Sequence, residues 1–191
     1  ADPMDVERIV RDNEPAAIVL VGTRVETGAA VQSSGCCVGA AGWILTTAHQ
    51  INGVSGLQAK TADGKVYAVA VEEIDTVREI ALLKTDPPLY RSVPIGDASQ
   101  LSNGSPLITI AAPENLVFST VTGVVSNINR TYRGYPVIQA DLRASPGSSG
   151  APVFDRNGAL VGMIIGKLEQ EDWITVVNPI NNAYGLLTKH G

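Results

Sequence analysis

Short apolar runs rich in Val, Ile and Thr, with turn residues between them, extend over almost the whole chain of 191 residues. Runs of this kind, with turn signals about every 8–12 residues, are typical of all-β sandwiches and barrels. Two segments are strong hairpin signals, because Asp-Gly and Asn-Gly tolerate the positive φ of such turns: Ala62-Asp63-Gly64 and Arg156-Asn157-Gly158. The pattern predicts strands over Ala17–Val21, Gly35–Val38, Trp43–Thr46, Leu57–Thr61, Val66–Glu72, Ile80–Lys84, Leu107–Ala111, Phe118–Asn127, Val137–Ala140, Ala151–Phe154, Leu160–Ile165 and Ile174–Val177.

A polar segment with several prolines, from 85 to about 104, separates these strands into two groups of six. We therefore expect an all-β fold of two packed, six-stranded antiparallel barrels. The N-terminal barrel would span 4–90, the linker 91–104 and the C-terminal barrel 105–191. Residues 1–3, which precede a methionine, are interpreted as a cloning remnant.

Two segments outside the barrels have helical patterns. Apolar residues recur at i, i+3 and i+4 after a candidate Asp5 cap, which predicts a short amphipathic helix over 4–13. The tail over 180–187 is compatible with a second short helix.

Composition excludes several classes of partner. The net charge of −5 argues against nucleic acid or an anionic membrane surface as the main partner. No apolar run approaches the roughly 20 residues of a membrane-spanning helix, so membrane insertion is not expected. The first residues lack a secretory signal pattern. A cytoplasmic location follows if Met4 is the native start, and a periplasmic or secreted one if the natural protein begins earlier.

The two cysteines, Cys36 and Cys37, are adjacent. Neighbouring Cα atoms are about 3.8 Å apart, less than the roughly 4.4–6.8 Å of an ordinary disulfide. In a strand their side chains would also point to opposite faces. We interpret both as reduced, partly buried apolar residues rather than as a redox pair. With only two His besides, a zinc site is not expected, and the sequence implies neither metal nor cofactor.

The stretch ASPGSSGAPVF, 144–154, combines Pro, Gly and Ser before an apolar run. One interpretation is a turn between strands, since these are ordinary turn residues. The other is that one of its serines is a nucleophile on a tight turn, whose backbone N–H groups could face a developing oxyanion. The second interpretation needs a histidine and a carboxylate elsewhere in the chain.

Candidate partners for the serine exist in the first half of the chain. His49 closes the apolar segment GWILTTAHQI, whereas His190 is the penultimate residue and is expected to be frayed. Glu79 directly precedes an apolar strand, and Asp75 is the nearby competing acid. Alone, His49 would be a structural histidine and Glu79 a solvated residue. Together with Ser149 they follow the order His, acid, Ser of one known triad fold.

These motifs resemble the trypsin-like serine peptidases, most closely their HtrA (Deg-type) branch. GWILTTAHQI, EIALLK and PGSSGAPVF carry the main likeness. RIVRDNEPAAIVLVG, VPIGDASQLSNGSPLITIAAP, STVTGVVSNINR, IQADLRASPGSSGAPVF and VVNPI extend it from about Val6 to Leu187. The resemblance implies a protein or peptide substrate, no cofactor, and further domains if the natural protein is longer.

Residue by residue, the resemblance implies Ser149 as nucleophile, His49 as general base and Glu79 as the triad acid. A serine needs such a base, and the base needs a carboxylate to fix its tautomer. The backbone N–H groups of Gly147 and Ser149 would form the oxyanion hole, and Ser148 would be a turn residue beside the nucleophile.

The resemblance also implies a substrate-binding region. The strand Ile164-Ile165-Gly166 would pair with the substrate backbone. Arg143 lies six residues before Ser149, where trypsin-type enzymes that select Lys or Arg carry an acid. With Ile165 and Val177 beside it, we expect a pocket for a small or medium apolar residue before the cleaved bond.

Several departures from the family pattern leave other functions open. Glu79 replaces Asp, Ser148 replaces Asn or Asp, and Ala151 replaces Gly. The extra methylene of Glu79 moves the carboxylate by about 1 Å, and misplacement of that size can cost on the order of 10²-fold in rate. We expect a serine endopeptidase. The alternatives are a weak or inactive pseudoprotease that acts as a binding or scaffold module, and a non-protease hydrolase with the same triad.

Overall fold

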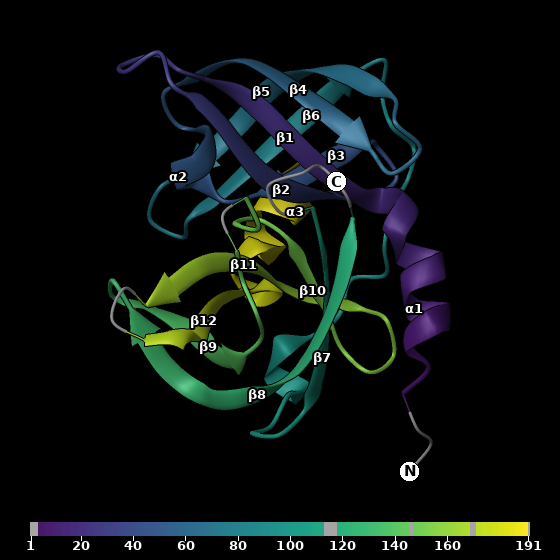
Figure 1. Ribbon diagram of the computed structural model, residues 1–191, viewed down its shortest axis with the longest axis vertical. Helices are drawn as coiled ribbons and strands as arrows, with labels where there is room; N and C mark the ends of the chain where they lie inside the picture. The colour runs from purple at the N-terminus through teal and green to yellow at the C-terminus, as the bar shows by residue number, and fades with distance from the viewer. Residues whose placement is uncertain (1–3, 113–117, 146, 169–170, 191) are drawn as a thin grey trace.

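The computed structural model describes residues 4–112, 118–145, 147–168 and 171–190, so the predicted cloning remnant at 1–3 lies outside the described residues. It consists of two closed barrels, one above the other in Figure 1. The first barrel comprises β1 (Ala17–Arg24), β2 (Ala30–Val38), β3 (Trp43–Thr46), β4 (Val54–Thr61), β5 (Val66–Asp75) and β6 (Ile80–Asp86). The second comprises β7 (Pro106–Ala111), β8 (Ser119–Tyr132), β9 (Tyr135–Asp141), β10 (Pro152–Phe154), β11 (Leu160–Leu168) and β12 (Glu171–Pro179). The predicted fold class is confirmed.

Both barrels have the same topology. The strand order is β1-β2-β3-β6-β5-β4 in the first and β7-β8-β9-β12-β11-β10 in the second, with all neighbours antiparallel. Among the described strands, closure leaves no unpaired sheet edge in either barrel, which removes the usual risk of edge-to-edge association. The two predicted hairpin turns are present, and Gly64 and Gly158 have φ values of 85° and 81° there.

Short helices lie at the ends of the barrels. The N-terminal helix α1 (Val6–Asn13) is capped by Asp5, whose carboxylate accepts a hydrogen bond from the Arg8 N–H at 3.0 Å. Figure 1 shows α1 running down the side of the second barrel, where the Asn13 side chain donates to the Gly158 carbonyl at 3.0 Å. The others are η1 (Glu14–Ala16), α2 (Ala48–Ile51), η2 (Ala98–Gln100), η3 (Ile180–Ala183) and α3 (Tyr184–His190).

The core is aliphatic and continues from one barrel into the other. Leu20, Leu45 and Leu82 of the first barrel share one buried cluster with Phe154 and Met163 of the second. Burial of each such side chain stabilises the fold by about 1.5–3 kcal/mol relative to exposure. This shared core fixes the relative placement of two units whose facing surfaces carry the candidate site.

Two expectations are corrected by the structure: the degree of burial of the cysteines and the disorder expected at His190. Cys36 and Cys37 are free, but both are fully buried rather than partly so. Burial raises the pKa of Cys37 to about 12, and that of Cys36 well above its usual range. His190 is not frayed: its carbonyl accepts a hydrogen bond from the Trp43 indole N–H at 3.3 Å, and the two rings meet edge to face.

Candidate active site

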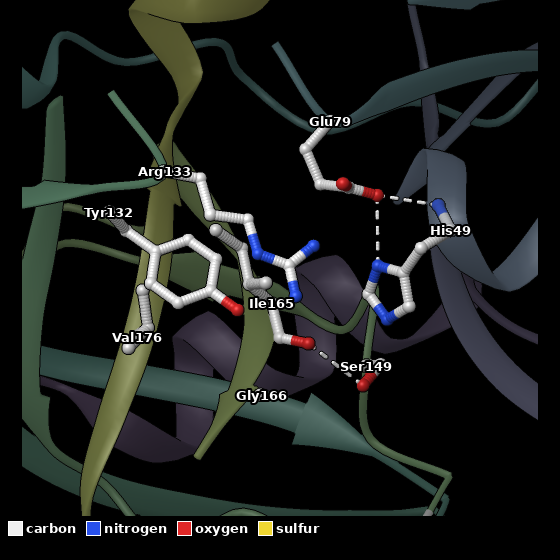
Figure 2. Close-up of a pocket in the computed structure, with 8 residues that line it drawn as sticks. All are labelled: His49, Glu79, Tyr132, Arg133, Ser149, Ile165, Gly166 and Val176. Atoms are coloured by element: carbon white, nitrogen blue, oxygen red, sulfur yellow. Dashed lines mark hydrogen bonds and ion pairs between the residues drawn. The ribbon is translucent and has the colours of Figure 1, made fainter. Parts of the chain in front are cut away.

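His49 lies on the single turn of α2. Strand β3 ends at Thr46, as predicted, and His49 lies three residues past its end. Two buried threonines, Thr46 and Thr47, make the connection. The His49 ring is part-exposed and lies in the pocket drawn in Figure 2.

Glu79 lies directly before β6 and points at His49. Its Oε1 atom accepts hydrogen bonds from His49 Nδ1, at 2.8 Å, and from the His49 backbone N–H. Its backbone has φ of 61°, in the left-handed region. Glutamate rarely adopts this conformation, which costs of order 1–3 kcal/mol and is most often found at functional sites.

The environment of Glu79 keeps it ionised. Burial by itself would raise the pKa of this carboxyl, but the hydrogen bonds that His49 donates and the nearby positive charges, including that of Arg133, outweigh burial and lower the pKa. The competing acid, Asp75, faces another way. Its carboxylate accepts from the Val77 and Arg78 backbone N–H groups and pairs with the Arg78 guanidinium.

Strand β2 of the first barrel holds the Ser149 turn of the second. The Ser34 N–H donates to the Ser149 carbonyl at 2.8 Å, and the Ser34 hydroxyl donates to the Gly147 carbonyl at 2.8 Å. Gly147 and Gly150 have φ values of 91° and 89°. A Cβ at Gly150 would lie 2.0 Å from the Ser34 carbonyl oxygen. The turn therefore requires glycine both for its backbone angles and for its close approach to β2.

The two adjacent serines have different surroundings. Ser148 is buried, and its hydroxyl donates to the Ser145 carbonyl at 2.6 Å and accepts from the Ser145 N–H at 2.9 Å. Ser149 is partly exposed, and its Oγ donates to the Ile165 carbonyl at 2.9 Å. Ser148 thus holds the turn together, while the Ser149 hydroxyl faces a pocket.

That pocket brings the three predicted triad residues to one place (Figure 2). Among the hydrogen bonds of the described residues, none joins His49 to Ser149, because His49 Nε2 pairs with the Gln50 side-chain amide at 3.0 Å. In substrate-free proteases catalytic hydrogen bonds are often long or unformed. The pocket is lined by His49, Glu79, Tyr132, Arg133, Ser149, Ile165, Gly166 and Val176.

The side chains of the predicted substrate-binding residues lie in different places. Ile165 and Gly166 line the pocket, and Ile164, expected to pair through its backbone, has its side chain in the core of the second barrel. The Val177 side chain, expected beside Ile165, is fully buried in the same core. Successive strand residues point to opposite faces, so Val176 rather than Val177 contributes to the lining. Arg143 is exposed and lies outside the lining of this pocket.

Three residues near the site escaped the sequence analysis. Tyr132 and Arg133 reach the pocket from the β8–β9 turn, whose Arg-Gly pair was not read as a hairpin signal. Asn178, fully buried, donates to the Arg78 carbonyl at 2.8 Å and so supports the segment that presents Glu79. The motif VVNPI contained this residue, but the sequence did not indicate its contact.

Within the described ranges, no group of three or more His, Cys, Asp and Glu residues is arranged to hold a metal ion. The helices of the described residues include none that is long and apolar enough to cross a membrane. The side chains that line the pocket include a hydroxyl, an imidazole, a carboxylate and a guanidinium.

Comparisons of sequence identify the family. The model of the trypsin-like peptidase domain matches residues 33–163. A probable periplasmic serine endoprotease, DegP-like, of Halomonas elongata is 32% identical over 133 residues, which cover 68% of this chain and 28% of that protein. Protease Do-like 1, chloroplastic, of Arabidopsis thaliana is 29% identical over 180 residues, 85% of this chain and 41% of that protein. The chain thus spans less than half the length of these relatives.

Solved structures share the fold. An HtrA-type protease, AlgW with a tripeptide, has a TM-score of 0.88 at 22% identity over 96% of this chain and 62% of its own. The serine endoprotease from Yersinia pestis has a TM-score of 0.83 at 24% identity over 99% of this chain and 67% of its own. This chain belongs to the trypsin-like peptidase family, and its relatives include proteases of the HtrA and Deg type.

Proposed function

We propose that this chain is a serine endopeptidase that uses Ser149 as nucleophile, His49 as general base and Glu79 as the triad acid. The observation that supports this most directly is the 2.8 Å hydrogen bond between Glu79 Oε1 and His49 Nδ1, beside a pocket that the Ser149 hydroxyl also faces. Family membership supports the reaction class, since the relatives carry the name serine endoprotease.

In the proposed reaction His49 Nε2 takes the proton of the Ser149 hydroxyl while Oγ bonds to the carbonyl carbon of the substrate. The Gly147 and Ser149 backbone N–H groups would stabilise the oxyanion. His49 then gives the proton to the leaving amine as the C–N bond breaks. In the second half of the reaction His49 takes a proton from water, whose oxygen bonds to the acyl carbon. His49 then returns the proton to Ser149 Oγ as the ester bond breaks. Glu79 would hold the imidazole in the required tautomer and stabilise its protonated form.

One rearrangement must precede chemistry. The Ser149 hydroxyl has to exchange the Ile165 carbonyl for His49 Nε2, and Gln50 has to release that nitrogen. A rotation about χ1 of Ser149 between staggered rotamers is a small change of this kind. It would also free the Ile165 carbonyl to accept an N–H of a substrate strand paired with Ile164-Ile165-Gly166.

The lining of the pocket supports a small or medium apolar residue before the cleaved bond. Ile165 and Val176 supply apolar walls, whereas Arg143 is exposed and outside the lining. In a library of peptides differing only at that position, we expect Ala, Val and Leu to give the highest kcat/KM. A dominant preference for Lys or Arg would contradict this assignment.

A catalytically inactive binding module is the second candidate. It is favoured by the present hydrogen bonds of the Ser149 hydroxyl and of His49 Nε2, neither of which joins the two residues. The two functions share the same pocket and differ only in whether Ser149 reacts.

Labelling with a fluorophosphonate probe separates the two candidates. We expect a covalent adduct, read by peptide mass, on Ser149 of the wild-type chain. Ser149→Ala should abolish both labelling and peptide hydrolysis with little change in thermal midpoint. Ser148→Ala is the matched control and should still be labelled at Ser149. Absence of labelling in a folded wild-type chain favours the binding module, and an adduct that survives Ser149→Ala contradicts the choice of nucleophile.

A further inference from the structure

The β8–β9 hairpin places an arginine at the edge of the pocket. Tyr132 pairs with Tyr135 across a two-residue turn, in which Arg133 has φ of 48° and Gly134 has φ of 87°. Two positive φ values in succession define the type I′ turn, whose first position favours Asn or Gly. A long, charged residue is conformationally unfavourable there, and unfavourable backbone conformations of this kind are found most often at functional sites.

Arg133 is exposed, and its guanidinium extends over the pocket. It lies over the Tyr132 ring, 5.1 Å from the ring centroid, and Figure 2 shows it reaching from the hairpin toward the Glu79 and His49 pair. The hairpin is close enough for electrostatic coupling in both directions. The charge of Arg133 contributes to lowering the pKa of Glu79, while burial and then the charge of Glu79 raise the pKa of Tyr135 to about 12.

Arg133 has no carboxylate partner among the described residues, since none lies within 4.0 Å of its guanidinium. Three other arginines do have such a partner, Arg8 with Asp12, Arg78 with Asp75 and Arg91 with Asp63, whereas Arg130 bonds to the Gln139 amide. Arg133 therefore holds an unneutralised positive charge beside the residues that would carry out the reaction. A guanidinium fixed on an aromatic ring is well suited to bind a carboxylate with two parallel hydrogen bonds.

We propose that Arg133 and Tyr132 form a subsite for an acidic side chain of the peptide substrate, at the second residue before the cleaved bond. This inference rests on the proposed function of the pocket. A peptide paired with Ile165 and Gly166 directs successive side chains to opposite faces. If the side chain of the residue just before the cleaved bond lies beneath the Ser149 turn, the side chain of the residue before that one faces the side of the pocket formed by His49 and Arg133.

A carboxylate in this subsite would also help the chemistry. Protonation of His49 in the transition state places a second positive charge near Arg133, and like charges repel. A substrate carboxylate bound to Arg133 would neutralise that repulsion. The acidic residue is therefore expected to raise kcat as well as to lower KM.

Matched peptides test the subsite. They share one sequence and carry Glu, Gln or Lys at the second position before the cleaved bond. For the wild-type chain we expect kcat/KM to favour Glu over Gln by about 10- to 100-fold, the usual range for one charge-assisted hydrogen-bonded contact. The ratio should fall as salt is added, because an exposed charge is screened.

Arg133→Asn is the informative variant, since Asn-Gly suits the type I′ turn and keeps the hairpin while removing the charge. It should bring the Glu to Gln ratio close to one, and Arg133→Glu should favour the Lys peptide. Arg130→Gln is the matched control: Arg130 is exposed on β8, the strand that leads into the turn, is bonded to Gln139 at 2.6 Å and lies outside the pocket. It should leave the wild-type ratio in place.

A wild-type ratio near one, or a ratio that survives Arg133→Asn, overturns the subsite. Peptide affinities measured with the Ser149→Ala variant, which cannot hydrolyse peptides, test the subsite independently of the proposed protease activity. Tighter binding of the Glu peptide that disappears with Arg133→Asn supports the subsite even if no peptide is hydrolysed. Hydrolysis without any preference for charge contradicts the subsite alone.

Discussion

Glu79 and His49 are joined by a 2.8 Å hydrogen bond from Nδ1 to Oε1, formed while Glu79 has a backbone φ of 61°. The carboxylate accepts from the ring and from the backbone N–H of the same histidine. The longer side chain of glutamate is thus accommodated by an unusual backbone conformation. An acid that is bonded to the histidine in this way meets the geometric requirement for the third member of a triad.

Loss of the Glu79 charge should greatly reduce activity. Glu79→Gln keeps the size of the side chain but can no longer fix the tautomer of His49 or stabilise its protonated form. We expect kcat for a peptide substrate to fall by roughly 10³–10⁴-fold. Glu79→Asp keeps the charge and relieves some backbone strain, so its loss should be smaller.

Asp75→Asn is the control for this comparison, because the Asp75 carboxylate is bonded to Arg78 and faces away from His49. Its kcat should stay close to that of the wild-type chain. Equal losses in Asp75→Asn and Glu79→Gln would mean that the triad acid has been assigned to the wrong residue.

Gly150→Ala should strongly destabilise the fold. The new Cβ would lie 2.0 Å from the Ser34 carbonyl oxygen and 2.5 Å from Thr46 Oγ1, and the backbone φ of 89° is unfavourable for alanine. We expect a loss of about 3 kcal/mol or more in the free energy of unfolding, measured with urea. Gly185→Ala, where an added Cβ meets nothing within 4 Å, should be neutral or slightly stabilising. Similar values for both variants would rule out the close contact between the barrels.

Gly166→Val should block the pocket without unfolding the protein. A Cβ at Gly166 meets no atom within 4 Å, although the residue lines the pocket. We expect kcat/KM for peptides to fall by on the order of 10-fold or more through misplacement of the substrate, with the thermal midpoint unchanged. Ile164→Val changes a fully buried side chain of the same strand and should instead lower the free energy of unfolding by about 0.5–1.5 kcal/mol. An unchanged kcat/KM in Gly166→Val would show that substrate does not lie along this strand.

The sequence was sufficient to predict the twelve strands and two barrels because the inward-facing residues are strongly apolar and the turns are marked by Gly. Strand ends were less predictable. Strand β8 was expected to stop at Asn127 but continues to Tyr132 through an exposed, polar stretch. Such a stretch is held in strand form by its pairing with β9, a contact between segments that local sequence does not express. The shared strand order of the two barrels likewise left no sequence repeat.

The pocket was predictable only where family resemblance supplied the long-range relationships. His49, Glu79 and Ser149 come from three separate segments, and composition or spacing alone could not bring them together. Arg133 and Asn178 were missed because their importance depends on where a hairpin and a strand lie in space. Val177 was expected beside the pocket, but its side chain faces the core of the second barrel, since the direction of each side chain follows from sheet pairing.

Asp97 should make stability depend on pH in the acid range. Its carboxylate accepts hydrogen bonds from the Asn181 side chain at 2.9 Å and from the Ser99 N–H and hydroxyl at 2.9 and 2.7 Å. These bonds, that of Asn181 first, lower its pKa from 3.8 to about 2. Because the pKa is lower in the folded chain than in the unfolded one, the stabilisation is complete above about pH 4 and is lost as the pH falls toward 2. Asp97→Asn should therefore lower the thermal midpoint at neutral pH, and its difference from wild type should shrink toward pH 2.

Asp12→Asn is the control: it removes only an exposed ion pair with Arg8 and should change the thermal midpoint little. A difference in thermal midpoint between Asp97→Asn and wild type that is the same at pH 2 and at neutral pH would contradict a stabilising hydrogen bond from Asn181 to the ionised Asp97 carboxylate.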